Sequence, residues 1–370
     1  MRTLRSTPIL VLLGLLAQPM LAPSVDAQEA TNGRIVASRW LRTESANEDI
    51  FTVKPDGTGV RHLTDGDPRD VDPQWSPDGA RIAFVKENLD LRKRDSLWVM
   101  NRNGRQKRRL DERRYFLSLD WSPDATKLVF AATDRGDTEL YVLDLATDEI
   151  TQLTDTPDSY ETDPSWSPDG TLIAYASNGL RGDIHTIEPD GENSTPLTEN
   201  GEAYAPEWSP DGSRIAFETT RDDENGRPPT GEGPYTSEIY VMDSGGENET
   251  RISNLQDTWD EEMAWVTNDL ITWRARYDDD VNDGPGADLD IYIARSDGSD
   301  RKNLTANRGT HDFNPAPSPD GRWIAFSREA ERGRESGLFK MRIDGSGVKK
   351  LLPATRGEAP SYIDWGVAAT

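Results

Sequence analysis

Short apolar segments recur along the chain, and a polar turn of nearly constant composition precedes them. The turn Trp-Ser-Pro-Asp-Gly occurs at residues 75–79, 166–170 and 208–212, and degraded copies lie at 121–125 and 317–321. Neighbouring copies in the first half of the chain are about 45 residues apart. A repeat of this length is typical of proteins that stack one structural unit many times.

Each repeat is expected to contain four β-strands. An apolar strand such as 82–84 follows the turn, and a further apolar strand such as 140–143 runs into a second polar turn. The unit ends on the pair Leu-Thr, for example at Leu153 and Thr154. Pro, Asp and Gly favour tight reversals, because Pro presets φ and Gly accepts a positive φ. The pattern predicts a four-stranded antiparallel meander, and radially stacked meanders form a β-propeller.

The two ends of the chain determine the number of blades. Residues 34–40, 50–53 and 61–64 have the pattern of the second, third and fourth strands of a blade, and no first strand precedes them. Residues 361–366 carry Trp365 at the place that a first strand requires. We therefore expect an all-β propeller, closed by its C-terminal strand into seven blades, with six blades as the alternative.

The repeat resembles the PD40 (WD40-like) repeats of the TolB family. The turn Trp-Ser-Pro-Asp-Gly, the strand Ile-Ala-Phe after it, and the Asp-Gly hairpin before Leu-Thr carry the resemblance. It covers essentially all of residues 28–370. The resemblance implies a propeller that binds a protein at one mouth of its channel, as TolB propellers bind a peptidoglycan-associated lipoprotein.

The N-terminus has the pattern of an export signal. Two arginines within the first five residues precede an apolar segment at 9–16, and the small residues before Ala27 suit a signal peptidase. We expect residues 1–27 to be a signal peptide and 28–370 to be one propeller domain, located in the periplasm or outside the cell. An uncleaved anchor is the alternative, and no other segment is apolar enough to span a membrane.

The composition narrows the function classes. Lys and Arg number 42 against 67 Asp and Glu, which gives a formal net charge of −25, and so acidic a chain does not wrap nucleic acid. The 11 tryptophans indicate a folded chain. Cysteine is absent, which excludes disulfides, thiolate zinc sites and cysteine nucleophiles. We expect an acidic, folded monomer.

Function is expected on one face of the ring, which we call the loop face. The links from strand two to strand three and from strand four to the next blade emerge there, because the strands alternate in direction. Long links at 219–237 and 274–287 lie on this face, and loops of that length are usually functional or disordered. The opposite face, the turn face, carries only short turns. The candidate binding residues for a protein or cell-envelope partner are Tyr204, Trp259, His311, Asp312, Phe313, Arg92 and Arg94.

Two charged segments each have two interpretations. Asp278, Asp280 and Asn282 alternate as calcium ligands do, and a solvated acidic loop is the alternative. We expect no other cofactor. The basic segment 92–114 is either a docking surface for an anionic partner or glycan, or a set of charges that keeps an outermost strand from pairing with another chain.

Two functions remain open. The first is a non-catalytic scaffold whose loop face binds a protein or cell-envelope partner. The second is a metal-assisted, glycan-active enzyme of the lyase type, since some propellers cleave acidic polysaccharides with a metal in a histidine-rich channel. The chain has only 3 histidines and neither a Gly-x-Ser-x-Gly nor a His-Glu-x-x-His motif. The composition favours the scaffold, and we assign no catalytic residue.

Overall fold

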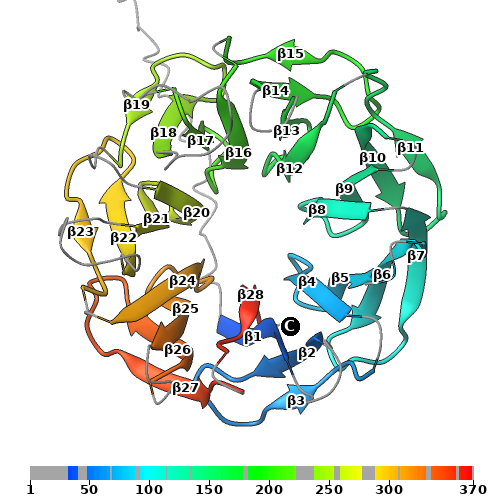
Figure 1. Ribbon diagram of the computed structural model, residues 1–370. Helices are drawn as coiled ribbons and strands as arrows, with labels where there is room; N and C mark the ends of the chain where they lie inside the picture. The colour runs from blue at the N-terminus through cyan, green and yellow to red at the C-terminus, as the bar shows by residue number, and fades with distance from the viewer. Residues whose placement is uncertain are drawn as a thin grey trace, which may run out of the picture.

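The chain forms a ring of four-stranded sheets (Figure 1). The computed structural model describes residues 32–40, 48–66, 69–88, 90, 92–113, 115–133, 136–157, 159–177, 182–199, 201–221, 237–253, 259–276, 288–306, 309–330, 335–355 and 358–368. These residues form seven antiparallel sheets and contain no helix. The prediction of an all-β, seven-bladed propeller is confirmed.

Each blade runs from an innermost strand at the channel to an outermost strand at the rim. Blade 1 consists of β28 (Ser361–Val367), β1 (Asn32–Trp40), β2 (Glu48–Val53) and β3 (Arg61–His62), and blade 2 of β4 (Arg69–Trp75), β5 (Arg81–Glu87), β6 (Asp95–Asn101) and β7 (Arg108–Arg113). Blade 3 consists of β8 (Tyr115–Trp121), β9 (Lys127–Thr133), β10 (Thr138–Asp144) and β11 (Ile150–Gln152), and blade 4 of β12 (Thr162–Trp166), β13 (Ile173–Ala176), β14 (Ile184–Ile187) and β15 (Thr195–Pro196). Blade 5 consists of β16 (Ala203–Trp208), β17 (Arg214–Thr219), β18 (Glu238–Asp243) and β19 (Thr250–Arg251). Blade 6 consists of β20 (Trp259–Thr267), β21 (Leu270–Arg276), β22 (Leu289–Arg295) and β23 (Lys302–Asn303). Blade 7 consists of β24 (Thr310–Pro317), β25 (Trp323–Ala330), β26 (Gly337–Arg342) and β27 (Lys349–Pro353).

The C-terminal strand closes the ring. β28 pairs antiparallel with β1, with Ile35 opposite Trp365 and Val36 opposite Asp364, so that the first blade takes strands from both ends of the chain. Gly33 and Gly366 lie at this junction, where an added Cβ would meet backbone atoms of Val367 and the Trp75 ring respectively. The predicted closure is confirmed.

The repeated turn is held by its serine and its aspartate. In blade 2, Ser76 Oγ donates to Asp78 Oδ1, the backbone N–H of Ala80 donates to the same carboxylate oxygen, and the N–H of Arg81 donates to Ser76 Oγ. The same bonds recur in blades 3, 4, 5 and 7. The aspartates therefore cap backbone N–H groups, as their type and spacing predict.

The Leu-Thr signature also has a repeated role. Thr154 Oγ1 accepts the backbone N–H of Leu140 at 3.0 Å and donates to Glu139 Oε2 at 2.6 Å. Thr198 and Thr305 make the equivalent pairs of bonds in their blades. The threonine thereby joins the fourth strand to the first residues of the third.

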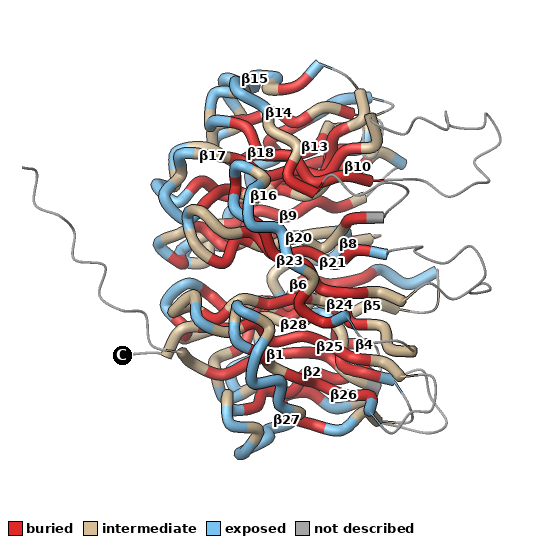
Figure 2. The backbone as a smooth tube through the Cα atoms, turned by 90° about the vertical axis from the view of Figure 1, so that its left-hand side faces the viewer, coloured by how far each residue is buried: buried red, intermediate tan, exposed pale blue. Residues whose placement is uncertain are grey.

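The hydrophobic core lies between adjacent blades. One cluster joins Val85 and Leu97 of blade 2 to Phe116, Trp121 and Phe130 of blade 3. The tryptophans of the innermost strands are buried, with 4–8% of their surface exposed. Figure 2 shows these buried strands from the side of the ring, between exposed turns. Since each blade buries its faces against its neighbours, stability depends on a closed ring.

Candidate binding site in the central channel

Each innermost strand carries a β-bulge, which lies at the same place in six blades and one residue earlier in blade 3. In blade 2 the pairing shifts between Val71 and Gln74, and a shift occurs in the other six blades as well. A bulge re-aims the side chain of the extra residue. We call the residue three places before the tryptophan position the bulge residue; it has a positive φ in six blades, at Asp72 (49°), Asp163 (54°), Ala205 (47°), Glu262 (55°), Asn314 (52°) and Tyr362 (49°).

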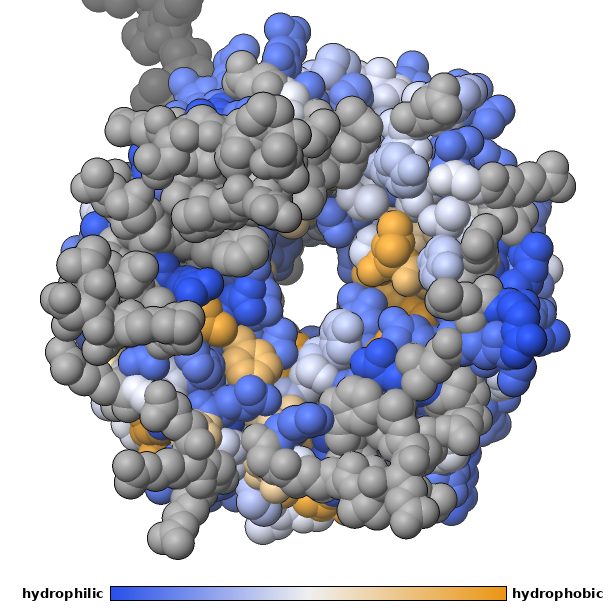
Figure 3. Space-filling model, viewed as in Figure 1, coloured by the Kyte–Doolittle hydropathy of each residue, from blue (hydrophilic) through white to orange (hydrophobic). Residues whose placement is uncertain are grey.

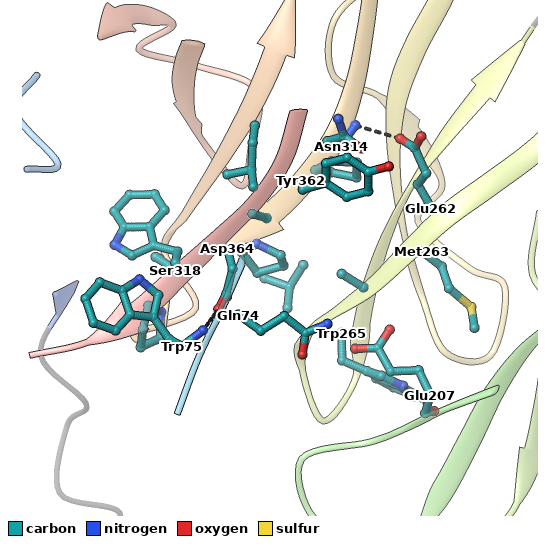
Figure 4. Close-up of a pocket in the computed structure, with 18 of the residues that line it drawn as sticks. Gln74, Trp75, Glu207, Glu262, Met263, Trp265, Asn314, Ser318, Tyr362 and Asp364 are labelled. Atoms are coloured by element: carbon teal, nitrogen blue, oxygen red, sulfur yellow. Dashed lines mark hydrogen bonds between the residues drawn. The ribbon is translucent and has the colours of Figure 1, made fainter. Parts of the chain in front are cut away.

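A cavity of about 640 Å³ occupies the channel inside these strands. Its lining includes the bulge residues Asp72, Glu262, Asn314 and Tyr362. The last three lie above the labelled tryptophans in the close-up of Figure 4. The residues directly before the tryptophans also line it, and three of these are the acids Asp120, Glu207 and Asp364. The described lining residues include five carboxyl groups and no Lys or Arg. The channel is therefore an acidic, water-accessible hollow.

Acids directly before the tryptophans join some blades to the next. The N–H of Trp75 donates to Asp364 Oδ2 at 2.7 Å, which links blade 1 to blade 2. The N–H of Trp166 donates to Asp120 Oδ2 at the same distance. Innermost strands are sheet edges whose N–H groups need partners. The channel carboxyl groups supply these partners across blade boundaries.

The bulge residues make a second set of such links. The N–H of Asn314 donates to Glu262 Oε2 at 2.6 Å, as the dashed line in Figure 4 shows. The N–H of Asp163 donates to Ser118 Oγ at 3.1 Å. Two layers of side chains therefore fix the channel wall.

Burial raises the pKa of the channel acids. It raises the pKa of Asp120 to about 7 and that of Glu207 to about 8, against hydrogen bonds from backbone N–H groups that lower both. Burial likewise raises the pKa of Asp72 and of Asp364 to about 6, and for Asp72 the charge of Asp364 adds to the shift. These groups change their ionisation near neutral pH.

Apolar side chains are exposed beside the channel and on the loop face. Leu117 on β8 is 53% exposed and Tyr362 on β28 is 43% exposed, while Tyr160, on the link that precedes β12, is 50% exposed. Hydrophobic residues border the hole beside β8 and between β20 and β24 in the face shown in Figure 3. Because aromatic and aliphatic groups dominate interface hot spots, this mouth can hold a partner.

The predicted binding residues do not share one environment. Tyr204 is only 7% exposed on β16, and burial raises the pKa of its hydroxyl. Asp312 is fully buried and accepts two bonds of 2.6 Å from the Arg328 guanidinium. His311 Nδ1 accepts the N–H of Leu289, and Phe313 is half-buried beside the bulge residue of β24. Tyr204 and Asp312 are therefore buried within the blades, whereas Phe313 is partly accessible and directly precedes Asn314, which lines the channel.

Other predicted residues lie elsewhere or outside the described residues. Arg92 and Arg94 are exposed on the link between β5 and β6, where Arg92 pairs with Asp90 at 2.8 Å. Trp259 begins β20, but its side chain is outside the described part of the structure, as are the three weak metal candidates Asp278, Asp280 and Asn282 and most of the long links 219–237 and 274–287. The role of all these residues in binding stays a prediction.

The basic segment 92–114 is partly neutralised by its own neighbours. Ion pairs join Arg108 to Asp148, Arg109 to Glu112 and Arg113 to Asp111. Three of its arginines lie on β7, the outermost strand of blade 2. The two interpretations of this segment, docking surface and edge protection, both stay predictions.

Our sequence analysis did not single out the channel acids. They follow a regular signal, because Asp120, Glu207 and Asp364 directly precede a tryptophan, and Asp72 and Asp163 stand three residues before one. Asp72 and the three acids that directly precede a tryptophan line the cavity.

In the described ranges, no group of three or more His, Asp or Glu side chains is arranged to hold a metal ion. Nor does any helix of membrane-spanning length and apolarity occur in that part of the chain.

Comparisons with known proteins agree with this fold. Residues 42–230 match the family model of the TolB β-propeller domain, PD40. The uncharacterized protein Atu1656 of Agrobacterium fabrum is 26% identical over 226 residues, which cover 59% of this chain and 66%, just under two thirds, of that protein.

Solved propellers of different function are similar in structure. The β-propeller domain of the trilobed protease from Pyrococcus furiosus has a TM-score of 0.65 at 17% identity, covering 88% of this chain and 96% of that one. TolB from Acinetobacter baumannii has a TM-score of 0.55 at 18% identity, covering 90% and 82%. Oligogalacturonate lyase from Vibrio parahaemolyticus has a TM-score of 0.58 at 12% identity, covering 88% and 87%. At these identities the similarity establishes the fold alone.

Proposed function

Because the chain belongs to the TolB β-propeller family, we propose that it is an exported, non-catalytic scaffold that binds a protein or cell-envelope component at the loop-face mouth of its channel. Residues 1–27 direct its export, so that it acts in the periplasm or outside the cell.

The observation that carries this proposal is the bonding of the channel acids. Asp120, Glu262 and Asp364 each accept a backbone N–H of the next blade. A carboxyl group engaged in this way fixes the wall, and a general acid or base would instead need to reach a substrate proton within hydrogen-bond distance. The wall thus supports a rigid frame around exposed apolar groups, which is the arrangement that binding surfaces favour.

The partner should present positive charge together with apolar groups. The cavity lining offers carboxyl groups and no cation among its described residues, so it attracts donors and repels acids. Leu117 and Tyr362 offer apolar area beside those carboxyl groups. A segment that carries Lys or Arg next to an aromatic or aliphatic residue satisfies both.

Capture experiments with matched variants test the proposal. The immobilised protein should retain partners from envelope extracts, and replacing Leu117 and Phe313 together by Ala should abolish retention, with a loss of about 2 kcal/mol for a true hot spot. Val348→Ala is the control, because Val348 is 45% exposed on the turn between β26 and β27. Trp259→Ala tests the predicted residue whose side chain is outside the described part.

Two results would contradict the proposal. The first is capture that survives the Leu117 and Phe313 changes but fails in Val348→Ala. The second is cleavage of acidic glycans by the pure protein with Mn²⁺ or Ca²⁺, which would favour the enzyme alternative.

A further inference from the structure

On the turn face, the gap between two neighbouring blades can be filled by an arginine from the blade that comes earlier in the chain. Arg81 of blade 2 extends over the ring of Trp121 in blade 3, with 5.2 Å between the guanidinium carbon and the ring centroid. Its Nη2 donates to the carbonyl oxygen of Ala125, in the turn of blade 3. The guanidinium thus joins two blades through one tryptophan and one turn carbonyl.

The gap between blades 5 and 6 is filled in the same way. Arg214 extends over Trp265 at 5.8 Å, and its Nη2 donates to the carbonyl oxygen of Asn268 at 2.7 Å. Its Nη1 donates to Ser296, in the second turn of blade 6. Both arginines stand six residues after the tryptophan of their own blade.

Between blades 3 and 4 the same position holds a lysine, and the gap is open. Lys127 stands six residues after Trp121 and lines the cavity described next. Its charge helps to lower the pKa of Asp124, but its ammonium lies within hydrogen-bond or ion-pair distance of no described residue. A cavity of about 230 Å³ lies here against Trp166 and Gly170. Trp166 corresponds to Trp121 and Gly170 to Ala125, so the cavity faces the two groups that Arg81 contacts one blade earlier.

We propose that this gap, which we call the blade 3–4 slot, is a binding site for a guanidinium group, supplied by an arginine side chain of a partner protein. The ligand would lie over Trp166 and donate to the carbonyl oxygen of Gly170, as Arg81 does with Trp121 and Ala125. The site goes beyond the proposed function, because it lies on the turn face.

The charges at the rim of the slot suit this ligand. The carboxylates of Asp124 and Asp169 line the cavity, and each holds its own turn through Oδ1. Oδ2 of both residues remains available as a charged acceptor, and a planar guanidinium uses such acceptors better than an ammonium does. Lys127 has a flexible stem and can turn towards solvent when a stronger ligand enters.

The volume of the slot also limits the size of the group that can occupy it. At about 230 Å³ the cavity is several times larger than the roughly 30 Å³ that one water occupies in the liquid. A side chain therefore fits, whereas a folded domain does not. Pro189 lines the slot at the position that corresponds to Ser296, which accepts a hydrogen bond from Arg214 in the gap between blades 5 and 6. A ligand in the slot therefore lacks this neutral acceptor. Its contacts are the tryptophan, the carbonyl oxygen and the two carboxylates.

Titration with N-acetyl-arginine amide tests the site. The probe should bind the full-length protein and perturb the indole N–H signal of Trp166, assigned through a Trp166→Phe variant, and N-acetyl-lysine amide should bind about tenfold more weakly. Lys127→Arg should fill the slot from within, abolish probe binding and raise the melting temperature. Asp169→Asn should weaken binding about tenfold.

The matched control uses the filled gap. Arg81→Lys should open an equivalent cavity beside Trp121 and create a second site for the arginine probe. The proposal is overturned if wild type does not bind the probe, if Lys127→Arg binds it as well as wild type does, or if the lysine probe binds equally. None of these results bears on capture at the loop face.

Discussion

The aspartates of the turn face and the acids of the channel are all carboxyl groups, but their pKa values are shifted in opposite directions. Hydrogen bonds from the backbone N–H of Thr171 and from Ser167 lower the pKa of Asp169 in its turn. Burial raises the pKa of Glu207 in the channel to about 8. The turn acids are charged caps, whereas the channel acids change their ionisation near neutral pH. An aspartate that recurs in the turn motif therefore has a structural role, whereas an acid directly before a tryptophan of an innermost strand lines the channel.

The largest expected effect comes from opening the ring on which this comparison depends. Deletion of residues 361–370 removes β28, leaves β1 as an unpaired edge and exposes the core beside Trp75. The free energy of unfolding should fall by several kcal/mol, at roughly 25 cal/mol for each Å² of apolar surface exposed. Denaturant unfolding followed by tryptophan fluorescence measures it.

A truncated chain that unfolds at the same denaturant concentration as the full-length protein would contradict ring closure. The control is removal of residues 369–370 alone, which lie beyond β28 and should leave the midpoint unchanged.

The second effect separates the two sets of acids directly. Hydrogen bonds from Ser213 and Ser209 outweigh partial burial and lower the pKa of Asp211. Asp211→Asn should cost about 1 kcal/mol of unfolding free energy, because charged acceptors form the stronger hydrogen bonds. At pH 5 Asp364→Asn should cost less, because its raised pKa of about 6 leaves that carboxyl group largely neutral there and an amide oxygen can still accept the N–H of Trp75, whereas Asp211 is still charged. Equal losses in the two variants would contradict the distinction.

The third effect is a salt response. A formal charge of −25 repels itself at low ionic strength, and salt screens that repulsion beyond a Debye length of about 10 Å at 0.1 M. The melting temperature should rise with NaCl. A flat response between about 0.05 and 2 M would indicate that the acids are compensated within the structure.

The smallest effect concerns the bulge itself. Ala205 has a φ of 47°, a conformation that glycine adopts without strain. Ala205→Gly should therefore change stability by less than about 1 kcal/mol, whereas Ala174→Gly in buried β13 should lower it by about that amount. If both variants lose the same stability, the positive φ at the bulge carries no strain.

Much of the fold could be predicted because each repeated residue has one local role. The turn motif predicted the tight turn that Asp78 holds, and Trp365 predicted closure by the C-terminal strand. The channel could not be predicted in the same way, because the residues that line it differ from blade to blade. The burial of Asp312 depends on Arg328 of the neighbouring strand, which no spacing along the chain shows.

The dependence of the unfolding free energy on pH distinguishes the turn acids from the channel acids. The turn acids have lowered pKa values, so their stabilisation is present above their ordinary pKa and is lost as the pH falls below it. The channel acids have raised pKa values, so the folded state binds more protons than the unfolded state, and stability falls as the pH rises from about 4 to 8.

Wild type should therefore be most stable near pH 4 and lose about 1–2 kcal/mol between pH 5 and pH 8, after allowance for solvent in the channel. The Asp120→Asn, Glu207→Gln double variant should lose clearly less over the same interval, while Asp211→Asn should keep the wild-type slope. The account is contradicted if the double variant falls as steeply as wild type between pH 5 and pH 8.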